Sequence, residues 1–132
     1  MAARVMVDTN ILFSAMFFPG ERINELMRKA AIENRLVLSS YVIDELFDVI
    51  RRKFPEQEKA ADIFLSRIPY ELVYTPKQPE PGLFDIRDPD DYAVLYSAIT
   101  EDVDIFITGD KDFEGLNLDK PEILTPAQFL TR

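Results

Sequence analysis

The chain has 132 residues, enough for one domain with a buried core, and 47% of them are hydrophobic, which excludes a disordered chain. It contains no cysteine and no histidine, so disulfides, thiolate or imidazole zinc sites, and Ser-His-Asp or Cys-His catalysis are excluded. The 24 acidic residues against 15 basic ones give a formal net charge of −9, which disfavours unspecific binding to a phosphate backbone.

Predicted strands and helices alternate along the chain. In chain order, the apolar patterns predict a strand at 5–7, helices at 11–18 and 23–31, a strand at 36–38, helices at 41–54 and 56–68, a strand at 72–74, a helix at 90–100, strands at 105–107 and 122–124, and a final helical turn at 126–130. Ser39 or Ser40 caps the helix 41–54, and Pro55 ends it. Residues 75–88, rich in proline, form the one long predicted loop.

This alternation is typical of an α/β fold, with a parallel sheet and helices on both of its faces. The strands 5–7 and 105–107 are apolar throughout, as expected of strands that are buried on both sides. The helix 56–68 is expected to direct one apolar face inward, formed by Ala60, Ile63, Phe64 and Ile68. Because 132 residues fit one domain, residues 1–132 are expected to form a single domain, and no internal repeat is found.

Two carboxylates that are distant in sequence follow predicted strands. Asp8 comes directly after the strand 5–7, and Asp110 follows the strand 105–107 after two small residues. In an open parallel sheet the C-terminal strand ends share one edge, and ligands bind in the crevice there. The sequence therefore predicts that Asp8 and Asp110 lie on the same rim.

Helical spacing selects two further carboxylates from among their acidic neighbours. Asp91 falls within the apolar stripe of its helix, whereas Asp90 points away from it. Glu45 lies at the edge of an apolar stripe, and Asp44 and Asp48 lie further toward the polar side. A carboxylate on a core-facing stripe is costly unless a cation or hydrogen-bond donors meet it.

Four converging carboxylates persist when a hard divalent cation neutralises them, and a set of oxygen ligands favours Mg²⁺ or Mn²⁺. Such an ion also offsets part of the net charge. Each acid taken alone has an ordinary alternative. Asp8 can form an Asx turn, Asp88 and its neighbours can cap a helix, Glu45 can pair with Arg52, and residues 110–112 can form a surface turn.

The combination of these motifs resembles the PIN-domain nucleases, and in particular the VapC-type toxins of toxin–antitoxin systems. The resemblance covers nearly the whole chain and is carried by Val-Asp8-Thr9-Asn10, by Glu45 in the helix after Ser39-Ser40, by Arg-Asp-Pro-Asp-Asp at 87–91, and by Thr-Gly-Asp-Lys-Asp at 108–112. It implies a three-layer α/β/α sandwich with a central parallel sheet. It also implies Mg²⁺- or Mn²⁺-dependent hydrolysis of RNA that leaves a 5′-phosphate and a 3′-hydroxyl.

The resemblance also implies roles for individual residues. The metal-binding and catalytic acids are implied to be Asp8, Glu45, Asp91 and Asp110, with Asp90 as the alternative to Asp91. Residues implied to hold these acids or to bind substrate are Thr9, Asn10, Asp88, Asp90, Thr108 and Asp112.

Partners follow from the same resemblance: an RNA substrate, an antitoxin protein that inserts a helix and a basic side chain, and a second copy in a homodimer. Apolar residues proposed for an interface, with core packing as the alternative, are Phe13, Met16, Phe17 and Phe18. Cations expected to follow the RNA backbone, with ordinary solvated helix charge as the alternative, are Arg51, Arg52, Lys53, Lys111, Arg22, Arg28 and Lys29. With no apolar run of bilayer length and no secretion leader, the expected location is the cytoplasm.

Two other functions compete with the nuclease. A phosphoryl-accepting receiver-type domain is also α/β and acidic at the strand rim, but the strands 36–38 and 72–74 end without an acceptor Asp. A non-catalytic protein-binding module of the same fold is the third interpretation. The presence of all four acids argues against it, and failure to bind Mn²⁺ would favour it.

Overall fold

The computed structural model describes residues 2–132, so that only Met1 of the predicted domain lies outside the described residues. The strands form one parallel sheet in the order β3-β2-β1-β4-β5, with bounds β1 Arg4–Val7, β2 Arg35–Ser39, β3 Glu71–Val73, β4 Ile105–Ile107 and β5 Glu122–Leu124. The helices are α1 Thr9–Phe17, α2 Glu21–Arg28, α3 Ser40–Lys53, α4 Glu58–Arg67, α5 Pro89–Thr100 and α6 Pro126–Leu130.

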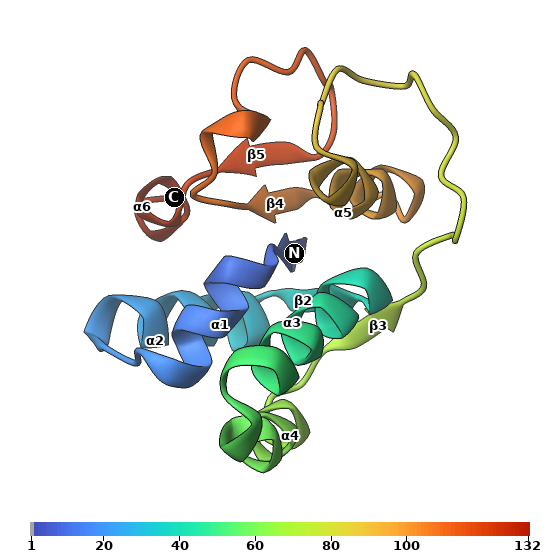
Figure 1. Cartoon of the computed structure of the whole chain (residues 1–132). Helices are drawn as coiled ribbons and strands as arrows, with labels where there is room; N and C mark the ends of the chain where they lie inside the picture. Colours follow the sequence, from blue (N-terminus) through green and yellow to red (C-terminus); the bar gives the residue numbers. More distant parts are fainter. Residues whose placement is uncertain (1) are drawn as a thin grey trace.

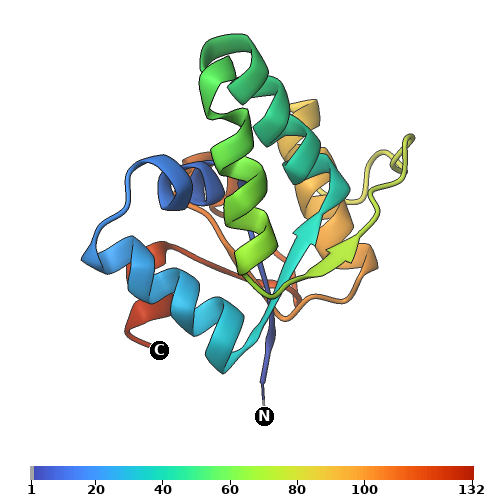
Figure 2. The ribbon, with the colours of Figure 1, turned by 90° about the horizontal axis from the view of Figure 1, so that it is seen from below.

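The sheet is the middle layer of three. Figure 1 shows β4, β5 and α5 together in one half of the molecule and β2, β3, α3 and α4 in the other, with β1 between them. Figure 2 shows α2 and α4 on one side of the strands, and α5 with the long loop on the other. β1 and β4, paired as Val5 with Ile105, are buried at Val5–Val7 and Ile105–Ile107, as their uniform apolarity predicts. The expected α/β/α sandwich with a central parallel sheet is confirmed.

Polar caps at the C-terminal ends of the strands start the helices that surround the site. Asp8 ends β1 and accepts a hydrogen bond from the backbone N–H of Ile11 at 3.0 Å, which caps α1. Ser39 ends β2 and caps α3 in the same way. Asp88 caps α5, with Pro89 in the first helical position. Three helices therefore begin at one edge of the sheet.

The long loop between β3 and α5 is held to the rest of the protein. At its start, the backbone N–H of Thr75 donates to Ser40 Oγ at 2.9 Å, and the hydroxyl of Ser97 donates to Thr75 Oγ1 at 2.7 Å. Further along, the ring of Phe84 stacks on Tyr92 of α5 with centroids 4.2 Å apart. The loop is anchored at both its start and its middle.

Ion pairs close the opposite edge of the sheet, where the strands begin. The Arg4 backbone N–H donates to Asp104 Oδ2 at 2.8 Å, and Lys120 Nζ lies 3.0 Å from Asp104 Oδ1. The Arg4 guanidinium pairs with Glu71 Oε2 at 2.8 Å. Each of these acids therefore meets a donor or a cation.

The inward face of α4 differs from the prediction. Ala61 and Leu65 are buried, whereas Ala60 is exposed and Ile63 is 41% exposed, so the prediction is wrong for those two residues. Phe64 and Ile68 are partly buried against the core, as predicted. Together with Ala61 and Leu65 they form the inward face of α4, which begins at Glu58 after a 3₁₀ turn at Pro55–Gln57. None of the helices within residues 2–132 has the length and apolarity to cross a membrane.

Candidate active site

One pocket of about 530 Å³ lies at the edge of the sheet where the strands end, and the four predicted acids all line it. Asp8 comes from the end of β1, Glu45 from the second turn of α3, Asp91 from the first turn of α5, and Asp110 from the turn after β4. Four separate elements, whose starts or ends meet at this edge, thus bring together acids that lie up to about a hundred residues apart.

Asp8 is buried, and both of its carboxylate oxygens accept hydrogen bonds. Oδ1 accepts from the N–H of Ile11, and Oδ2 accepts from the hydroxyl of Thr108. The same Thr108 oxygen accepts from the N–H of Asp110 at 3.1 Å, so that one hydroxyl links two acids. Burial raises the pKa of Asp8 above its ordinary value, and these hydrogen bonds oppose that rise.

Glu45 is held from the neighbouring helix. The hydroxyl of buried Thr9, the first residue of α1, donates to Glu45 Oε1. α1 and α3 pack against each other, which keeps this contact in place. Asn10 also lines the pocket and is exposed there.

The tightest group of carboxylates belongs to Asp91, Asp110 and Asp112, each of which offers an oxygen within 4.8 Å of the others. Burial, together with the negative charges of Asp110, Asp88, Asp112 and Glu45, raises the pKa of Asp91 to about 7. Asp112 therefore lies within the carboxylate cluster itself, and not only behind it. Crowding of this kind stores repulsion that a cation would relieve.

The structure also separates the two candidates for the third acid. Asp91 faces Asp110, whereas Asp90 is exposed and accepts a hydrogen bond from the hydroxyl of Tyr41. Asp88 caps α5 by accepting from the N–H of Asp90 at 2.8 Å. Both Asp88 and Asp90 line the pocket at its rim.

Besides Glu45, five residues of α3 line the pocket, and of these only Arg52 was expected to contact a ligand: Tyr41, Asp44, Asp48, Val49 and Arg52. Helical spacing had placed Asp44 and Asp48 on the polar side, which is correct, since both are exposed, but this side faces the pocket mouth. The signal available in the sequence was the spacing of Tyr41, Glu45, Asp48 and Arg52, which share one helix face.

The profile of the PIN domain family matches residues 4–112, a range that contains all of the acids above and ends at Asp112. The chain belongs to the PIN domain family. Among solved structures, this PIN domain is similar to a chain of the crystal structure of VapBC2 from Rickettsia felis bound to a DNA fragment from their promoter. That match has a TM-score of 0.69 and 25% identity, and covers 92% of this chain and 96% of that chain. A search of the curated proteins gave no match.

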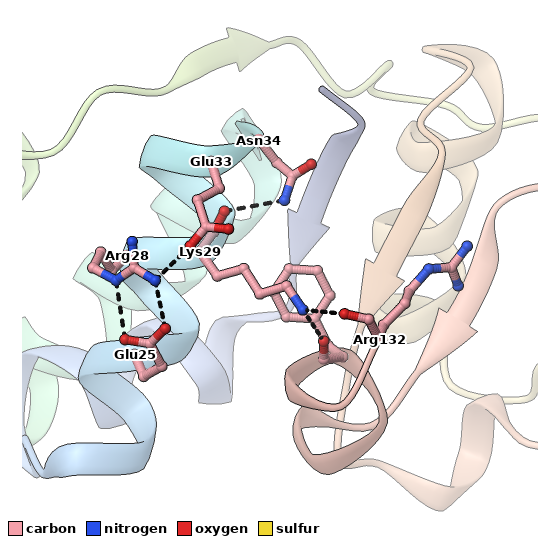
Figure 3. A network of polar contacts seen from close by, with 7 residues as sticks. Glu25, Arg28, Lys29, Glu33, Asn34 and Arg132 are labelled. Atoms are coloured by element: carbon pink, nitrogen blue, oxygen red, sulfur yellow. Dashed lines mark hydrogen bonds and ion pairs between the residues drawn. The ribbon is translucent and has the colours of Figure 1, made fainter. Parts of the chain in front are cut away.

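Several cations that were expected to follow an RNA backbone are engaged elsewhere in this PIN domain. Arg28 pairs with Glu25 and Glu33, and Lys29 donates to the backbone oxygens of Phe129 and Arg132 at 2.7 and 2.9 Å (Figure 3). Arg51, near the C-terminal end of α3, pairs with Glu58, the first residue of α4. Arg28, Lys29 and Arg51 therefore have partners within the fold, and their contact with RNA stays a prediction. Arg52 alone of the predicted set lines the pocket.

The donor set fits a hard divalent cation. Its side-chain ligand atoms are carboxylate and hydroxyl oxygens, and the whole sequence lacks cysteine and histidine. The raised pKa values of Asp8 and Asp91 show that the protein's own donors compensate the charge only in part. Oxygen ligands of this kind suit hard cations such as Mg²⁺, Mn²⁺ and Ca²⁺.

Proposed function

We propose that this chain is a Mg²⁺- or Mn²⁺-dependent endoribonuclease, formed by one PIN-like nuclease domain of residues 1–132, and that it is the toxin of a toxin–antitoxin pair acting in the cytoplasm. PIN domains are generally nucleases, and the match to the family covers every acid of the pocket. The similar Rickettsia felis chain comes from a VapBC2 structure, which supports the toxin assignment. RNA as the substrate rests on the resemblance to VapC-type toxins.

One observation carries the proposal. Oxygens of Asp91, Asp110 and Asp112 lie within 4.8 Å of one another, in the same pocket as Asp8 and Glu45. Within the described part of the chain, Arg52 is the only basic residue that lines this pocket. An unneutralised cluster of this kind costs stability, so its presence indicates a site built for a divalent cation and a phosphate.

When bound there, the cation supplies an acidified water for in-line attack on phosphorus and positive charge beside the phosphoryl oxygens. The chain's own residues fix where this happens. Thr108 orients Asp8 and Asp110 together, and Thr9 orients Glu45. This arrangement holds the acids before any ligand arrives, which lowers the cost of organising the site. Because the nucleophile is water, the ribose 2′-hydroxyl takes no part in the reaction.

Cleavage of labelled RNA with Mn²⁺ or Mg²⁺ tests the proposal. Asp8→Asn and Asp91→Asn are each expected to lower the rate by about 100-fold or more, a loss comparable to the removal of one electrostatic contact to the transition state. Asp62→Asn on α4 is the matched control, since this exposed Asp does not line the pocket. The products should carry 5′-phosphate and 3′-hydroxyl ends. Equal cleavage by all four proteins, or 2′,3′-cyclic ends, would contradict the assignment.

The antitoxin part of the proposal is supported by apolar surface at the C-terminal ends of α1 and α3. Phe18 is 69% exposed and Phe54 is 40% exposed, and both lie against Phe13, with ring centroids 6.1 and 6.0 Å away. Large exposed aromatic groups of this kind mark protein-binding surfaces. The product of a small reading frame beside the gene should bind the chain and stop RNA cleavage. Phe18→Ser should weaken that binding without changing the cleavage rate of the free chain.

A further inference from the structure

A second cavity, of about 230 Å³, adjoins the acidic pocket. Tyr41 and Asp44 line both cavities, so that the two adjoin at the start of α3. The remaining wall comes from α3, the stem of the long loop and α5, through Ser40, Thr75, Pro76, Lys77, Pro79 and Ala93. Neither the sequence analysis nor the family match assigns a role to this cavity.

The walls of this cavity suit one flat, partly polar group. The ring of Tyr41 and the rings of Pro76 and Pro79 offer apolar faces. Thr75 Oγ1 accepts a hydrogen bond from the N–H of Tyr41 and shares another with the hydroxyl of Ser97, so that this wall of the cavity is polar. The volume is smaller than the ~300–1,000 Å³ of pockets for drug-sized molecules, so it fits a group the size of one nucleobase.

The cavity is formed before any ligand binds. Thr75, at the start of the loop, is held to Ser40 and Ser97 by the hydrogen bonds described above, and the hydroxyl of Tyr41 donates to Asp90. The two prolines restrict the loop further. A site that is already ordered loses little entropy when a ligand enters.

The face of α3 that lies between the two cavities is long enough for several nucleotides. Tyr41 and Arg52 lie eleven residues apart on this face. At 1.5 Å per residue they are separated by about 16 Å along the helix axis. Glu45 and Asp48 lie between them and line the acidic pocket.

A basic residue lies toward each end of this path. Arg52 lines the acidic pocket at one end, and Lys77 lines the small cavity at the other. Among residues 2–132, each is the only basic residue lining its cavity, and neither forms an ion pair or a side-chain hydrogen bond. Arg28, Arg51 and Lys29, by contrast, are engaged within the fold. Charges left free on both sides of an acidic centre suit a polyanion that crosses it.

We propose that single-stranded RNA lies along this face of α3, with the scissile phosphate at the acids, one base in the cavity against Tyr41, and backbone phosphates beside Lys77 and Arg52. The inference rests on the proposed function, since it specifies how that site takes its substrate. It also explains how a chain of net charge −9 binds a polyanion, because the contacts are few and local.

Salt dependence of RNA binding tests the two phosphate contacts. Affinity of a fluorescent single-stranded oligoribonucleotide is measured in the Asp8→Asn background with Mg²⁺, where cleavage is suppressed. Each phosphate contact on a single strand contributes about 0.7 to the slope of log affinity against log salt. Lys77→Ala and Arg52→Ala should each lower the slope by about 0.7, and the double variant by about 1.4. Lys59→Ala, an exposed cation on α4, is the control and should leave the slope unchanged.

Substitution of Tyr41 tests the base site separately. Tyr41→Ala should weaken binding about 5- to 100-fold through lost stacking, without changing the salt slope. Tyr41→Phe keeps the ring and loses only the hydrogen bond to Asp90, so it should bind nearly as tightly as the parent. Equal loss in both Tyr41 variants would show that the hydroxyl, and not base stacking, matters.

The outcomes separate this inference from the proposed function. If the slopes of Lys77→Ala and Arg52→Ala equal that of Lys59→Ala, the path along α3 is wrong, even where the wild type cleaves RNA with Mn²⁺. If the slopes fall as stated and the wild type cleaves nothing, the path holds and the nuclease proposal fails. If no RNA binds at any salt concentration, the path is wrong.

Discussion

Carboxylates at the two edges of the sheet lie in opposite electrostatic environments. At the edge where strands begin, Asp104 accepts from the N–H of Arg4 and pairs with Lys120, and these contacts lower the pKa of its carboxyl group. At the edge where strands end, burial and neighbouring negative charge raise the pKa of Asp91 to about 7 and also raise that of Asp8. The negative charge is compensated by donors and cations of the chain at the edge where strands begin, and it is left largely uncompensated at the edge where strands end.

This contrast separates carboxylates that stabilise the fold, such as Asp104, from carboxylates that are available for a ligand, such as Asp91. Asp104 has its donors in the chain itself, so the folded state favours its ionised form. Asp91 has acids around it, so the folded state disfavours its ionised form until a cation arrives. A raised pKa at a concave acidic site is a physical marker of function, here supported by geometry.

Thr108→Val should have the largest effect, which is a loss of Mn²⁺ affinity at the edge where strands end. The substitution removes the hydroxyl that donates to Asp8 and accepts from the N–H of Asp110. Loss of a group that orients metal ligands costs about 10- to 100-fold in metal affinity, so Mn²⁺ binding by calorimetry should weaken by that factor. Thr108→Ser keeps the hydroxyl and should restore most of the affinity. An unchanged affinity in the valine variant would show that Asp8 and Asp110 need no such link.

A smaller effect should follow from pH. Because the pKa of Asp91 is about 7, a cation must displace its proton at lower pH. Apparent Mn²⁺ affinity should therefore rise about tenfold from pH 6 to pH 8 and then level off, as expected for loss of one proton with that pKa. Asp91→Asn should bind Mn²⁺ more weakly and lose this rise. A flat profile in the wild type would place the ion away from Asp91.

The smallest effects concern stability, and they should have opposite signs at the two edges. In metal-free protein at pH 8, Asp91→Asn should raise the melting temperature by about 3–6 °C after solvent screening is allowed for, since it removes a disfavoured charge. Asp104→Asn should lower the free energy of unfolding by about 1 kcal/mol through a weakened hydrogen bond and ion pair.

The effect of pH on stability should have opposite signs for Asp104 and Asp91. The contribution of Asp104 is present above its ordinary pKa and is lost as the pH falls through its lowered pKa. The penalty from Asp91 is complete above its raised pKa of about 7, and it decreases as the pH falls from about 7 toward the ordinary carboxyl pKa of 3.8. Thermal unfolding across this range, in each variant, measures both. The same sign at both edges would contradict the comparison.

Short apolar runs and polar caps explain why much of the fold could be predicted. Each predicted strand and helix is present, and the parallel sheet follows from their alternation. On α4, the predicted face did not include Leu65, which is buried together with Ala61. The inward face is rotated relative to the predicted one, because packing against the core selects among the apolar residues of a helix.

The apolar periodicity and the order of the elements predict that Asp8 and Asp110 follow parallel strands at one edge and that Asp91 lies on a core-facing stripe, because these patterns can be read along the chain. That Thr108 donates to Asp8, that Arg28 and Arg51 pair with Glu25 and Glu58, and that Lys77 and Tyr41 line one cavity depends on the tertiary structure. These contacts join segments whose approach depends on the packing of whole layers, and side-chain charge alone does not specify its partner.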